Sequence, residues 1–548
     1  MSEVEVLVVG AGTVGLATAL FLARHGLKPV VVERHPGLSR HPRAFAVNSR
    51  SAELFREAGV EECLVAASAA LARNQGVLSV STLAAVEEAT VTSKGVTADL
   101  LAEASRVSPA RLGSCPQDLI DPVLLASARA HGAEFHFDTE LIALHQDSGV
   151  LVDLHDRRTG RPHQLRARHV VATDGATSTV RRLLDIPTTG PGELGGHMIN
   201  VLFQADLTAV VGERTFAMCT IQNPWSSGIL IPVDNANRWI FHIPYSVAEG
   251  TTAADYPHDR CKALVQAAIG GSEVDVTILS VLPWQSTAHT ATRFRHGNVF
   301  LAGDAAHVVP PTGGFGLNTG LADAHNLAWK LAAVHRGQAG EALLDTYEVE
   351  RRPVALATMD QAVLRGQHRA LHWDLSPARA ADRAAVGMAG IFVTALGYHY
   401  DSTAVIHPRT QPPSTEHVHH NLDGAPGTRV PHTWLRRGGH TVSTVDLAAG
   451  TFTLLAGPAA AHWCNAAEAV SERTGIPIRA YRVGPGGDAE DPTNEWPTIS
   501  GTGAHGALLV RPDGFVAWRT TDTTADPAST LMEALNQVLN RTPRPAAV

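Results

Sequence analysis

The sequence predicts an α/β protein with a parallel sheet covered by helices, an antiparallel sheet, and a small α/β unit near the C-terminus. Three observations predict this fold class. An apolar strand, a glycine-rich turn and a helix follow one another near the N-terminus. Alternating strand patterns fill the region from about 190 to 285. A strand–helix–strand–hairpin pattern then occupies the tail.

The length of 548 residues allows roughly two to four domains. We expect a discontinuous first domain formed by residues 1–185 and 286–400, because strand patterns of the same parallel type occur in both segments. The antiparallel pattern predicts a second domain over residues 186–285, and the tail predicts a third over residues 401–548.

The composition is that of an ordinary globular enzyme, with 44% hydrophobic and 18% charged residues. Lys and Arg number 44 against 53 Asp and Glu, which gives a net charge of −9. No run of basic residues interrupts this balance. We therefore expect no nucleic-acid partner and no membrane surface.

The five cysteines are odd in number and scattered, and none forms a Cys-x-x-Cys motif. In a chain of this length they predict reduced thiols and a cytoplasmic location, and they offer no structural zinc site. His417, His419 and His420 cluster after two prolines, but no carboxylate or second cluster fixes a ligand geometry. We expect a solvated loop there and no metal.

The N-terminal motif has the order of a dinucleotide site. Residues 3–9 predict an apolar strand, the turn Gly-Ala-Gly-Thr-Val-Gly follows, and residues 16–25 predict a helix. Gly10 permits the turn, Gly12 lets the backbone approach a pyrophosphate, and Gly15 lets helix and strand pack closely. The helix N-terminus offers free N–H groups and a positive dipole end to the phosphates.

A membrane span is the competing interpretation of this segment, because residues 6–23 carry no charge. Glu3 and Glu5 precede it where an export signal would have Lys or Arg, so the strand–turn–helix interpretation is favoured. Glu33 ends the second strand, where an acidic residue accepts hydrogen bonds from ribose hydroxyls. The motif itself does not distinguish NAD from FAD.

Two later segments make that distinction. Residues 169–173 predict a strand that runs into Asp174 and Gly175. Residues 299–302 predict a strand that runs into Gly303 and Asp304, followed by a Pro- and Gly-rich segment at 310–320 and then a helix. Such an entry to a helix leaves backbone N–H groups unpaired and directed at an acceptor.

With these three fingerprints in order, the chain resembles the class A flavoprotein aromatic hydroxylases, the p-hydroxybenzoate hydroxylase superfamily. The resemblance implies a Rossmann-like FAD-binding domain and an antiparallel substrate-binding sheet. In that family the residue at the position of Asp304 binds the ribityl chain of FAD. The segment matching 310–320 lies along the isoalloxazine, and the segment of Asp174 touches FAD and influences NAD(P)H use.

Two further segments carry the resemblance. Arg43, in a Pro-Arg-Ala run, matches the family arginine that lies near the flavin, and Gln117 matches a glutamine that contacts the FAD ribose or phosphate. Leu141 would lie against the adenine. Phe315 and Leu317 stand where many relatives have Gln and Met, which puts the fine positioning of the flavin in doubt. The expected cofactor-binding residues are Gly10, Gly12, Thr13, Val14, Gly15, Glu33, Arg34, Arg43, Gln117, Leu141, Asp174, Asp304, Gly314, Gly316, Leu317 and Asn318.

The reaction that the resemblance implies is FAD-dependent monooxygenation, with NADPH or NADH as electron donor and O2 as co-substrate. In the family, reduced flavin and O2 form a C4a-hydroperoxide whose distal oxygen passes to an electron-rich ring. This chemistry needs a dry cavity and orientation more than acid–base groups. Arg43 and Pro311 are the catalytic candidates, through flavin positioning. His307 is a candidate base, although a packed histidine is the favoured interpretation.

The strands predicted at 198–205, 215–222, 228–233, 239–244 and 274–283 fit an antiparallel sheet that roofs the flavin and holds a small aromatic substrate. The aromatic candidates for lining an apolar pocket there are Trp225, Trp239, Phe241, Tyr245 and Trp284, with Phe315 from the flavin segment. At strand spacing, any single one of the sheet aromatics is also explained as core.

The tail predicts strands at 452–455 and 478–483, a helix at 461–474 and a hairpin at 508–519. This pattern resembles the thioredoxin-like C-terminal domain of phenol hydroxylase-type relatives. Without a Cys-x-x-Cys motif it carries no dithiol chemistry, so we expect a structural or dimer-forming role in a monomer or homodimer.

The closest resemblance is to bacterial aromatic-polyketide hydroxylases of the aklavinone and tetracenomycin hydroxylase type, carried by residues 396–400, 443–447 and 509–514. It implies hydroxylation of a polycyclic phenol or quinone. Hydroxylation of a simpler phenol and Baeyer–Villiger oxidation of a polyketide remain open. From a different class, an FAD-binding scaffold or redox sensor without turnover also remains open.

Overall fold

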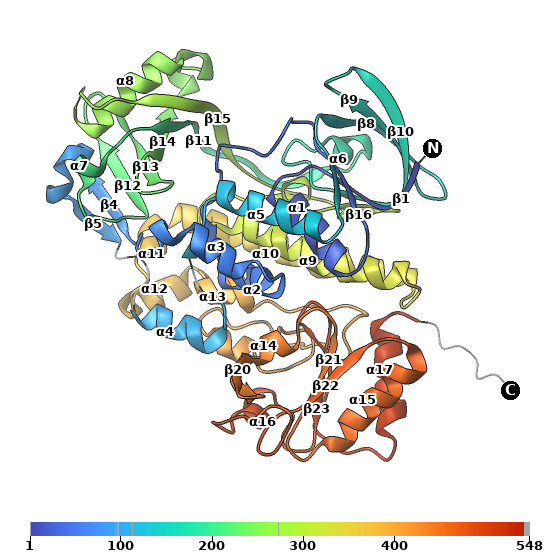
Figure 1. Ribbon diagram of the computed structural model, residues 1–548. Helices are drawn as coiled ribbons and strands as arrows, with labels where there is room; N and C mark the ends of the chain where they lie inside the picture. Colours follow the sequence, from blue (N-terminus) through green and yellow to red (C-terminus); the bar gives the residue numbers. More distant parts are fainter. Residues whose placement is uncertain (1, 94, 96–97, 112, 272, 542–548) are drawn as a thin grey trace.

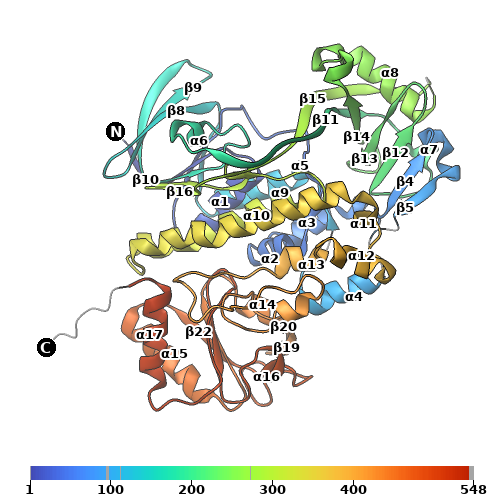
Figure 2. The same ribbon diagram turned by 180° about the vertical axis from the view of Figure 1, so that it is seen from behind.

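The structure is a computed structural model that describes residues 2–93, 95, 98–111, 113–271 and 273–541. Three bodies are visible in Figures 1 and 2. The long helices α9 (Phe315–His335) and α10 (Thr346–Gln367) run through the middle one. A second sheet topped by α8 (His258–Ile269) lies at one end, and the C-terminal unit lies on the other side of the long helices.

The first sheet is parallel at its centre. β1 (Ser2–Val9) lies between β10 (Arg161–Ala172) and β2 (Val30–Val32), and β17 (Val299–Leu301) and β7 (Glu134–His136) extend the sheet on either side. The strands predicted at 3–9, 169–173 and 299–302 are confirmed. Antiparallel strands complete the sheet: β8 (Thr139–Gln146), β9 (Val150–Asp156) and β16 (Arg295–His296). All of β2 and β17 and the last residues of β1 and β10 are apolar and buried, as expected for the centre of a parallel sheet.

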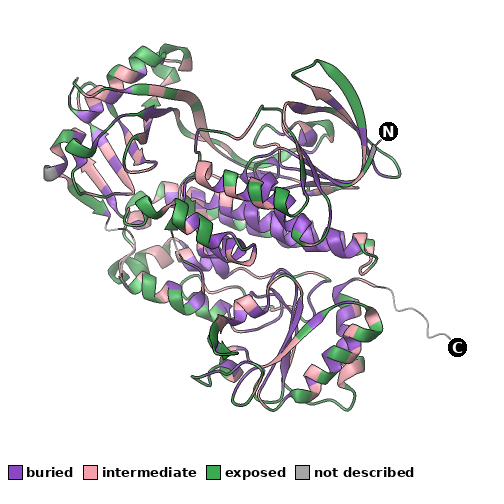
Figure 3. Ribbon diagram, viewed as in Figure 1, coloured by how far each residue is buried: buried purple, intermediate pink, exposed green. Residues whose placement is uncertain are grey.

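Helix α9 is the most deeply buried helix of the middle body, and Figure 3 shows it buried along most of its length. It packs with α1 (Thr13–Arg24), which also contacts α5 (Gln117–Ala130). The sequence predicted a helix after residue 320, but α9 already begins at Phe315. The glycines of this turn serve packing inside the helix, because a Cβ at Gly320 would lie 2.6 Å from Val14 Cγ2. None of the described helices is both long and apolar enough to span a bilayer.

The second sheet is mainly antiparallel, as predicted, and runs in the order β18-β15-β11-β14-β13-β12-β4-β5. Its strands are β11 (Thr188–Gln204), β12 (Met218–Gln222), β13 (Ser227–Pro232), β14 (Arg238–Tyr245), β15 (Thr277–Ala291), β4 (Val77–Val80), β5 (Thr90–Ser93) and β18 (His307–Val308).

The limits of this sheet differ from those expected at 186 and 285. β4 and β5 come from the segment assigned to the first domain, and β15 continues to Ala291 before the chain returns to the first sheet. β4 pairs in parallel with β12, whose backbone N–H and C=O groups would otherwise form an open edge. Residues 77–93 therefore belong structurally with the second sheet.

The C-terminal unit is the α/β body that the tail predicts. β21 (Phe452–Ala456) pairs in parallel with β22 (Ile478–Arg482) and antiparallel with β23 (Ala507–Val510), which pairs with β24 (Val516–Thr520). α15 (Ala461–Thr474) packs on β21 and β22 and contacts α17 (Pro527–Val538), a helix that the sequence analysis did not predict. The remaining helices include α2 (Ser49–Glu57), α3 (Glu61–Ala67), α4 (Ala98–Val107), α6 (Thr179–Leu183), α7 (Thr208–Val211), α11 (Arg369–Trp373), α12 (Ala380–Ala385), α13 (Ile391–Leu396), α14 (Thr444–Leu447) and α16 (Trp496–Ile499).

Buried ion pairs join the C-terminal unit to the long helices. Arg511 donates to both carboxylate oxygens of Glu350 on α10, at 2.5 and 2.9 Å, and Lys330 of α9 donates to the same carboxylate at 2.7 Å. Asp513 pairs with Arg511 from the other side. Burial disfavours the charge of Glu350, but Arg511 and Lys330 hold its pKa well below the ordinary value. These charges are compensated by one another and not by water.

Glu350→Ala tests this junction. The substitution leaves Lys330 and Arg511 buried with one carboxylate fewer, so we expect a loss of about 3–5 kcal/mol in the free energy of unfolding. The urea midpoint, followed by tryptophan fluorescence, measures it. Asp382→Ala is the control, because it breaks an exposed pair with Arg379 (3.0 Å) and should cost less than about 1 kcal/mol. Equal effects of the two variants would contradict a junction made by buried charge.

Candidate active site

The glycine-rich turn after β1 leaves the N-terminus of α1 facing open space. Gly10 has a φ of +102°, in the region that glycine favours. Gly12 is the N-cap of α1, and none of the described atoms comes within 4 Å of the place where its Cβ would stand. Gly15 packs against the Gly10 carbonyl with no room for a side chain. Free N–H groups at this end of α1 suit a pyrophosphate.

Glu33 lies beside this turn, just beyond the end of β2. Its Oε2 accepts a hydrogen bond from Ala11 N at 2.7 Å, and its Oε1 accepts one from His35 N at 2.9 Å. Each carboxylate oxygen can accept a further hydrogen bond, so Glu33 retains the capacity to bind ribose hydroxyls. The neighbouring Arg34 is exposed, and its Nε donates to His35 Nε2 at 3.3 Å.

A buried acid, Asp121, links expected cofactor residues from three segments. Thr13 Oγ1 donates to Asp121 Oδ1 at 2.5 Å, and Gln117 Nε2 donates to Asp121 Oδ2 at 3.4 Å. Gln117 Oε1 accepts from the backbone N–H of Arg43 at 3.3 Å. These bonds fix the first turn of α1, the start of α5 and the Arg43 segment relative to one another. The sequence analysis missed Asp121, although its place one turn after Gln117 on α5 was a usable signal.

Asp174 and Asp304 follow the adjacent strands β10 and β17, at the edge where parallel sheets bind ligands. Asp174 Oδ2 accepts from Val180 N at 3.0 Å and so caps α6, while its Oδ1 has no partner among the described residues. Asp304 is exposed, yet the surrounding protein raises its pKa by desolvation, an effect opposed by His307 and Arg43. The carboxylate of Asp304 is thus accessible although protein surrounds it on most sides, a position that suits hydrogen bonding to a polar ligand.

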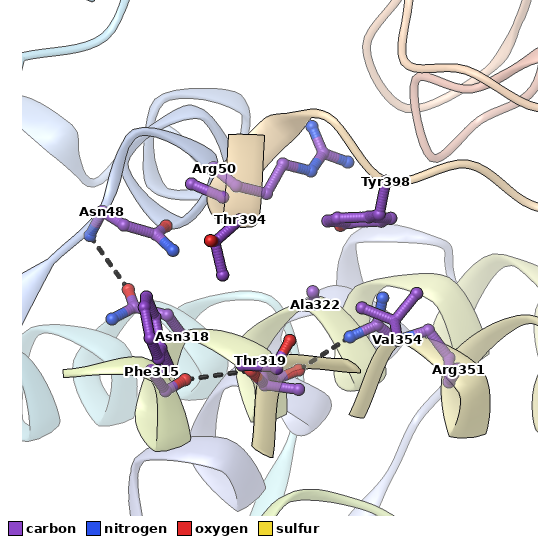
Figure 4. A pocket seen from close by; sticks show the side chains of 12 residues that line it. Asn48, Arg50, Phe315, Asn318, Thr319, Ala322, Arg351, Val354, Thr394 and Tyr398 are labelled. Atoms are coloured by element: carbon purple, nitrogen blue, oxygen red, sulfur yellow. Dashed lines mark hydrogen bonds between the residues drawn. The ribbon is translucent and has the colours of Figure 1, made fainter. Parts of the chain in front are cut away.

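The entry to α9 is fixed from behind, as Figure 4 shows. Asn318 Oδ1 accepts from Asn48 N at 3.0 Å, and its Nδ2 donates to the carbonyls of Ala46 and Gly314 at 3.0 and 2.6 Å. The predicted residue Asn318 therefore holds the glycine segment against residues 46–48. Behind it lies a cavity of about 20 Å³ lined by Arg50 and Tyr398 among others, which has room for about one water.

The other residues expected in this segment have distinct surroundings. Pro311 is exposed, and a Cβ at Gly314 would lie 3.1 Å from that of Ala46. A Cβ at Gly316 would lie 3.9 Å from Val309, and Leu317 packs on the first core. The ring of Phe315 is buried, with the guanidinium of Arg365 5.4 Å from its centre. Leu141 is buried in the same core as Leu317, and its contact with adenine stays a prediction.

The two faces of the second sheet have different neighbours, and this corrects three of the predicted substrate residues. Side chains alternate along a strand, and Trp239 and Phe241 point to the face covered by α8, where they form core with Cys261 and Val265. Trp239 Nε1 donates to the Ala205 carbonyl at 3.1 Å. Trp225 lies on the turn between β12 and β13 and is 76% exposed. Trp239 and Phe241 are thus core residues on the face away from the first domain, and Trp225 is a surface residue. Tyr245 also packs against the α8 core.

The opposite face carries Asn200, His242 and Trp284 and meets two residues of the first domain, Phe45 and His41. His41, Asn200, His242 and Trp284 are here called the roof cluster. Asn200 on β11 is paired directly with His242 on β14. Trp284 Nε1 donates to His242 Nδ1 at 3.4 Å. Burial lowers the pKa of His41, and lowers that of His242 to about 4, so both are neutral near pH 7. Only Trp284 of this cluster was among the predicted aromatic candidates.

Comparisons with known proteins identify the family. Residues 3–362 match the family of the FAD binding domain, and residues 423–542 match the family described as aromatic-ring hydroxylase, C-terminal. The chain belongs to the FAD-dependent aromatic-ring hydroxylases. It is 41% identical over 548 residues to aklavinone 12-hydroxylase of Streptomyces purpurascens, covering 98% of this chain and 99% of the relative.

Two further relatives agree with this membership. Tetracenomycin A2 monooxygenase-dioxygenase of Streptomyces glaucescens is 39% identical over 572 residues, covering 98% of this chain and 97% of the relative. The crystal structure of aklavinone-11 hydroxylase in a ternary complex with FAD and aklavinone has a TM-score of 0.87 and 39% identity, covering 99% and 100%. This aromatic-ring hydroxylase is an FAD-dependent monooxygenase.

The residues of this hydroxylase fit FAD. Gly12 gives the backbone open space at the N-terminus of α1, and Glu33 lies where a ribose would follow. Gln117 and Arg43 are already bonded to each other, and the unpaired Oδ1 of Asp174 and the exposed Asp304 stand beyond them at the sheet edge. Within the part of the chain that the structure describes, no group of His, Cys, Asp or Glu is arranged to hold a metal ion.

Asp121→Asn tests the buried acid under the turn. Burial raises the pKa of Asp121 to about 7, so the folded protein retains a proton there at pH values where the unfolded chain has lost it. The contribution of this group to stability therefore falls as pH rises from about 4 to about 7. The variant keeps an oxygen acceptor for Thr13. We expect its stability relative to the native protein to rise by about 2 kcal/mol between pH 5.5 and pH 8.

Thermal unfolding at the two pH values measures this difference. Asp275→Asn is the matched control, because that side chain is 95% exposed and its removal should give no such pH dependence. A stability difference between Asp121→Asn and the native protein that stays constant from pH 5.5 to pH 8 would show that Asp121 is already ionised in the folded state.

Proposed function

We propose that this monooxygenase hydroxylates a polycyclic aromatic polyketide, a phenol or quinone, with NADPH or NADH as electron donor and O2 as co-substrate. The observation that carries the proposal is the end-to-end similarity, at 39–41% identity, to oxygenases named for tetracenomycin and aklavinone. The free cysteines support a cytoplasmic reaction. A monomer or homodimer is the proposed assembly.

The chain supplies position and a dry environment for this reaction. FAD held by these residues would supply the redox chemistry that couples oxidation of NADPH or NADH to insertion of one atom of O2 into the ring, with water as the other product. Thr13, Gln117 and Arg43 hold the cofactor end of the site in one arrangement through Asp121. On the substrate side, Phe45 packs against an apolar part of the roof formed by Leu202, Ile231, Val233 and Ile240. Apolar walls exclude water from the reacting atoms.

The first test is NADPH oxidation by the purified FAD-loaded protein, with and without aklavinone, a panel of hydroxylated anthraquinones and 3-hydroxyphenylpropionate. We expect stimulation by a polycyclic phenol and a product that has gained one oxygen atom, present as a new ring hydroxyl group. If 3-hydroxyphenylpropionate alone stimulates NADPH oxidation, the substrate is a simple phenol and the proposed polycyclic class is wrong. A product carrying a new ester would indicate Baeyer–Villiger chemistry, and bound FAD with no stimulation by any compound would indicate a non-catalytic flavoprotein.

Asp304→Ala tests the cofactor site separately. Loss of a carboxylate that bonds FAD removes a charge-assisted hydrogen bond, so we expect soluble, folded protein with FAD bound about tenfold to a hundredfold more weakly. The ratio of flavin to protein absorbance after gel filtration measures retention, and Asp275→Ala should retain FAD fully. Full retention of FAD by Asp304→Ala would overturn the assignment of this residue.

A further inference from the structure

The roof cluster holds buried polar atoms that the protein leaves without partners. Both ring nitrogens of His41 and the side-chain oxygen of Asn200 are buried without a well-aligned hydrogen bond among the described residues, although Asn200 lies close enough to His41 to raise its pKa in part against the effect of burial. His41 is 4% exposed and Asn200 is 7% exposed, so bulk water does not provide the missing hydrogen bonds. Each such atom costs roughly 1–3 kcal/mol when unsatisfied, and native proteins retain such atoms where a ligand or a function accounts for them.

The donors and acceptors of these atoms are complementary to a hydroxyl group. Burial lowers the pKa of His41, so its ring is neutral and offers one N–H donor and one acceptor. Asn200 Oδ1 is an acceptor. A phenolic hydroxyl can donate to Asn200 and accept from His41 at the same time. An ether or a quinone carbonyl has no proton to give and would leave Asn200 Oδ1 unpaired.

The remaining two members lie beside Asn200 on the same face of the sheet. His242 is the direct cross-strand partner of Asn200, and its Nδ1 accepts from Trp284 Nε1 at 3.4 Å. A neutral His242 therefore carries its proton on Nε2. Asn200, His242 and Trp284 stand on the paired strands β11, β14 and β15 of one sheet. His41 belongs to the irregular segment before residue 46 of the first domain.

The cluster also lies where a substrate would meet the flavin. His41 precedes Arg43 by two residues, and Arg43 is bonded to Gln117 and is close enough to Asp304 to influence its pKa. Phe45, from the same segment, packs against the apolar part of the roof. The segment 41–45 therefore connects the cofactor residues with the inner face of the second sheet.

We propose that His41 and Asn200, positioned by His242 and Trp284, form the subsite that binds a phenolic hydroxyl of the aromatic substrate. The proposal rests on the function proposed above and deepens it, because it makes a free hydroxyl on the ring a requirement for binding. His41 and Asn200 bind the hydroxyl directly; His242 and Trp284 are positioning residues.

The test compares binding of 2-hydroxyanthraquinone and its methyl ether, 2-methoxyanthraquinone, to the FAD-loaded enzyme by quenching of flavin fluorescence. A site built around a hydroxyl rejects an analogue that lacks the proton, so we expect the native enzyme to prefer the phenol by at least about tenfold. In Asn200→Leu and His41→Phe the preference should fall to less than about threefold, mainly through weaker binding of the phenol.

His197→Phe is the matched control, since His197 precedes Asn200 on β11 but contacts Tyr245 on the face covered by α8. It should keep the full preference for the phenol. FAD content and melting temperature establish that each variant is folded, and Asn200→Ala replaces Asn200→Leu if the larger side chain impairs folding.

The outcomes separate this proposal from the proposed function. A native enzyme that binds both probes equally, or neither, overturns the subsite, and so does a preference that survives in both Asn200→Leu and His41→Phe. Because binding is measured without turnover, the result is independent of NADPH oxidation. A native enzyme that discriminates the probes but oxidises NADPH with none of the polycyclic compounds refutes the proposed function and leaves the binding subsite standing.

Discussion

The carboxylate of Asp323, in the middle of α9, is the constraint on which the arrangement of the site depends. It accepts hydrogen bonds from Gly303 N at 3.1 Å, His307 Nε2 at 2.6 Å and Arg351 Nε at 2.8 Å, all within the protein interior. Burial disfavours its charge, but His307 and Arg351 hold its pKa below the ordinary value. One buried charge thus ties the turn that carries Asp304 to both long helices, and the fully buried His307 in this contact fits the favoured interpretation of a packed histidine. Any movement of that turn would separate charges that water cannot reach, at a cost of several kcal/mol.

Buried charged side chains also hold the C-terminal unit in place, although this unit lies far from the expected site of the reaction. Arg351 donates through its other end to the hydroxyl of Tyr400 at 3.1 Å, and its neighbour Glu350 binds Arg511. Arg429 of the connecting segment pairs with Glu53 on α2, the helix that follows the flavin-positioning segment. The unit therefore fixes α2 and α10 from outside. Both helices pack against α9, which begins at the glycine-rich segment and carries Asn318, so these contacts are structural support for that helix.

These networks also show which features could be predicted from the sequence. The glycine turn, Glu33 and the α/β pattern of the tail are local, since a few neighbouring residues determine each of them, and the structure has them where they were expected. The resemblance added Gln117 and Arg43, which the structure joins by a hydrogen bond. The face of Trp239 could not be predicted, because a period of two shows which residues share a face but not which face is covered. Asp121 and Asn200 gain meaning only from partners distant in the sequence, and no single-sequence pattern marks such residues.

The alternation that misled the prediction for Trp239 also explains how this fold separates stability from specificity. Along β11, Ile199 and Val201 belong to the core under α8, whereas Asn200 and Leu202 between and beyond them face the first domain. The covered face is complete without any ligand, so its packing holds the sheet together whatever the substrate is. The inner face can then exchange hydroxyl-binding residues for others at little cost to that core. Because function lies in residues placed on a scaffold and not in the scaffold itself, we expect the side chains of the inner face, and not the aromatics of the sheet core, to determine which ring this enzyme accepts.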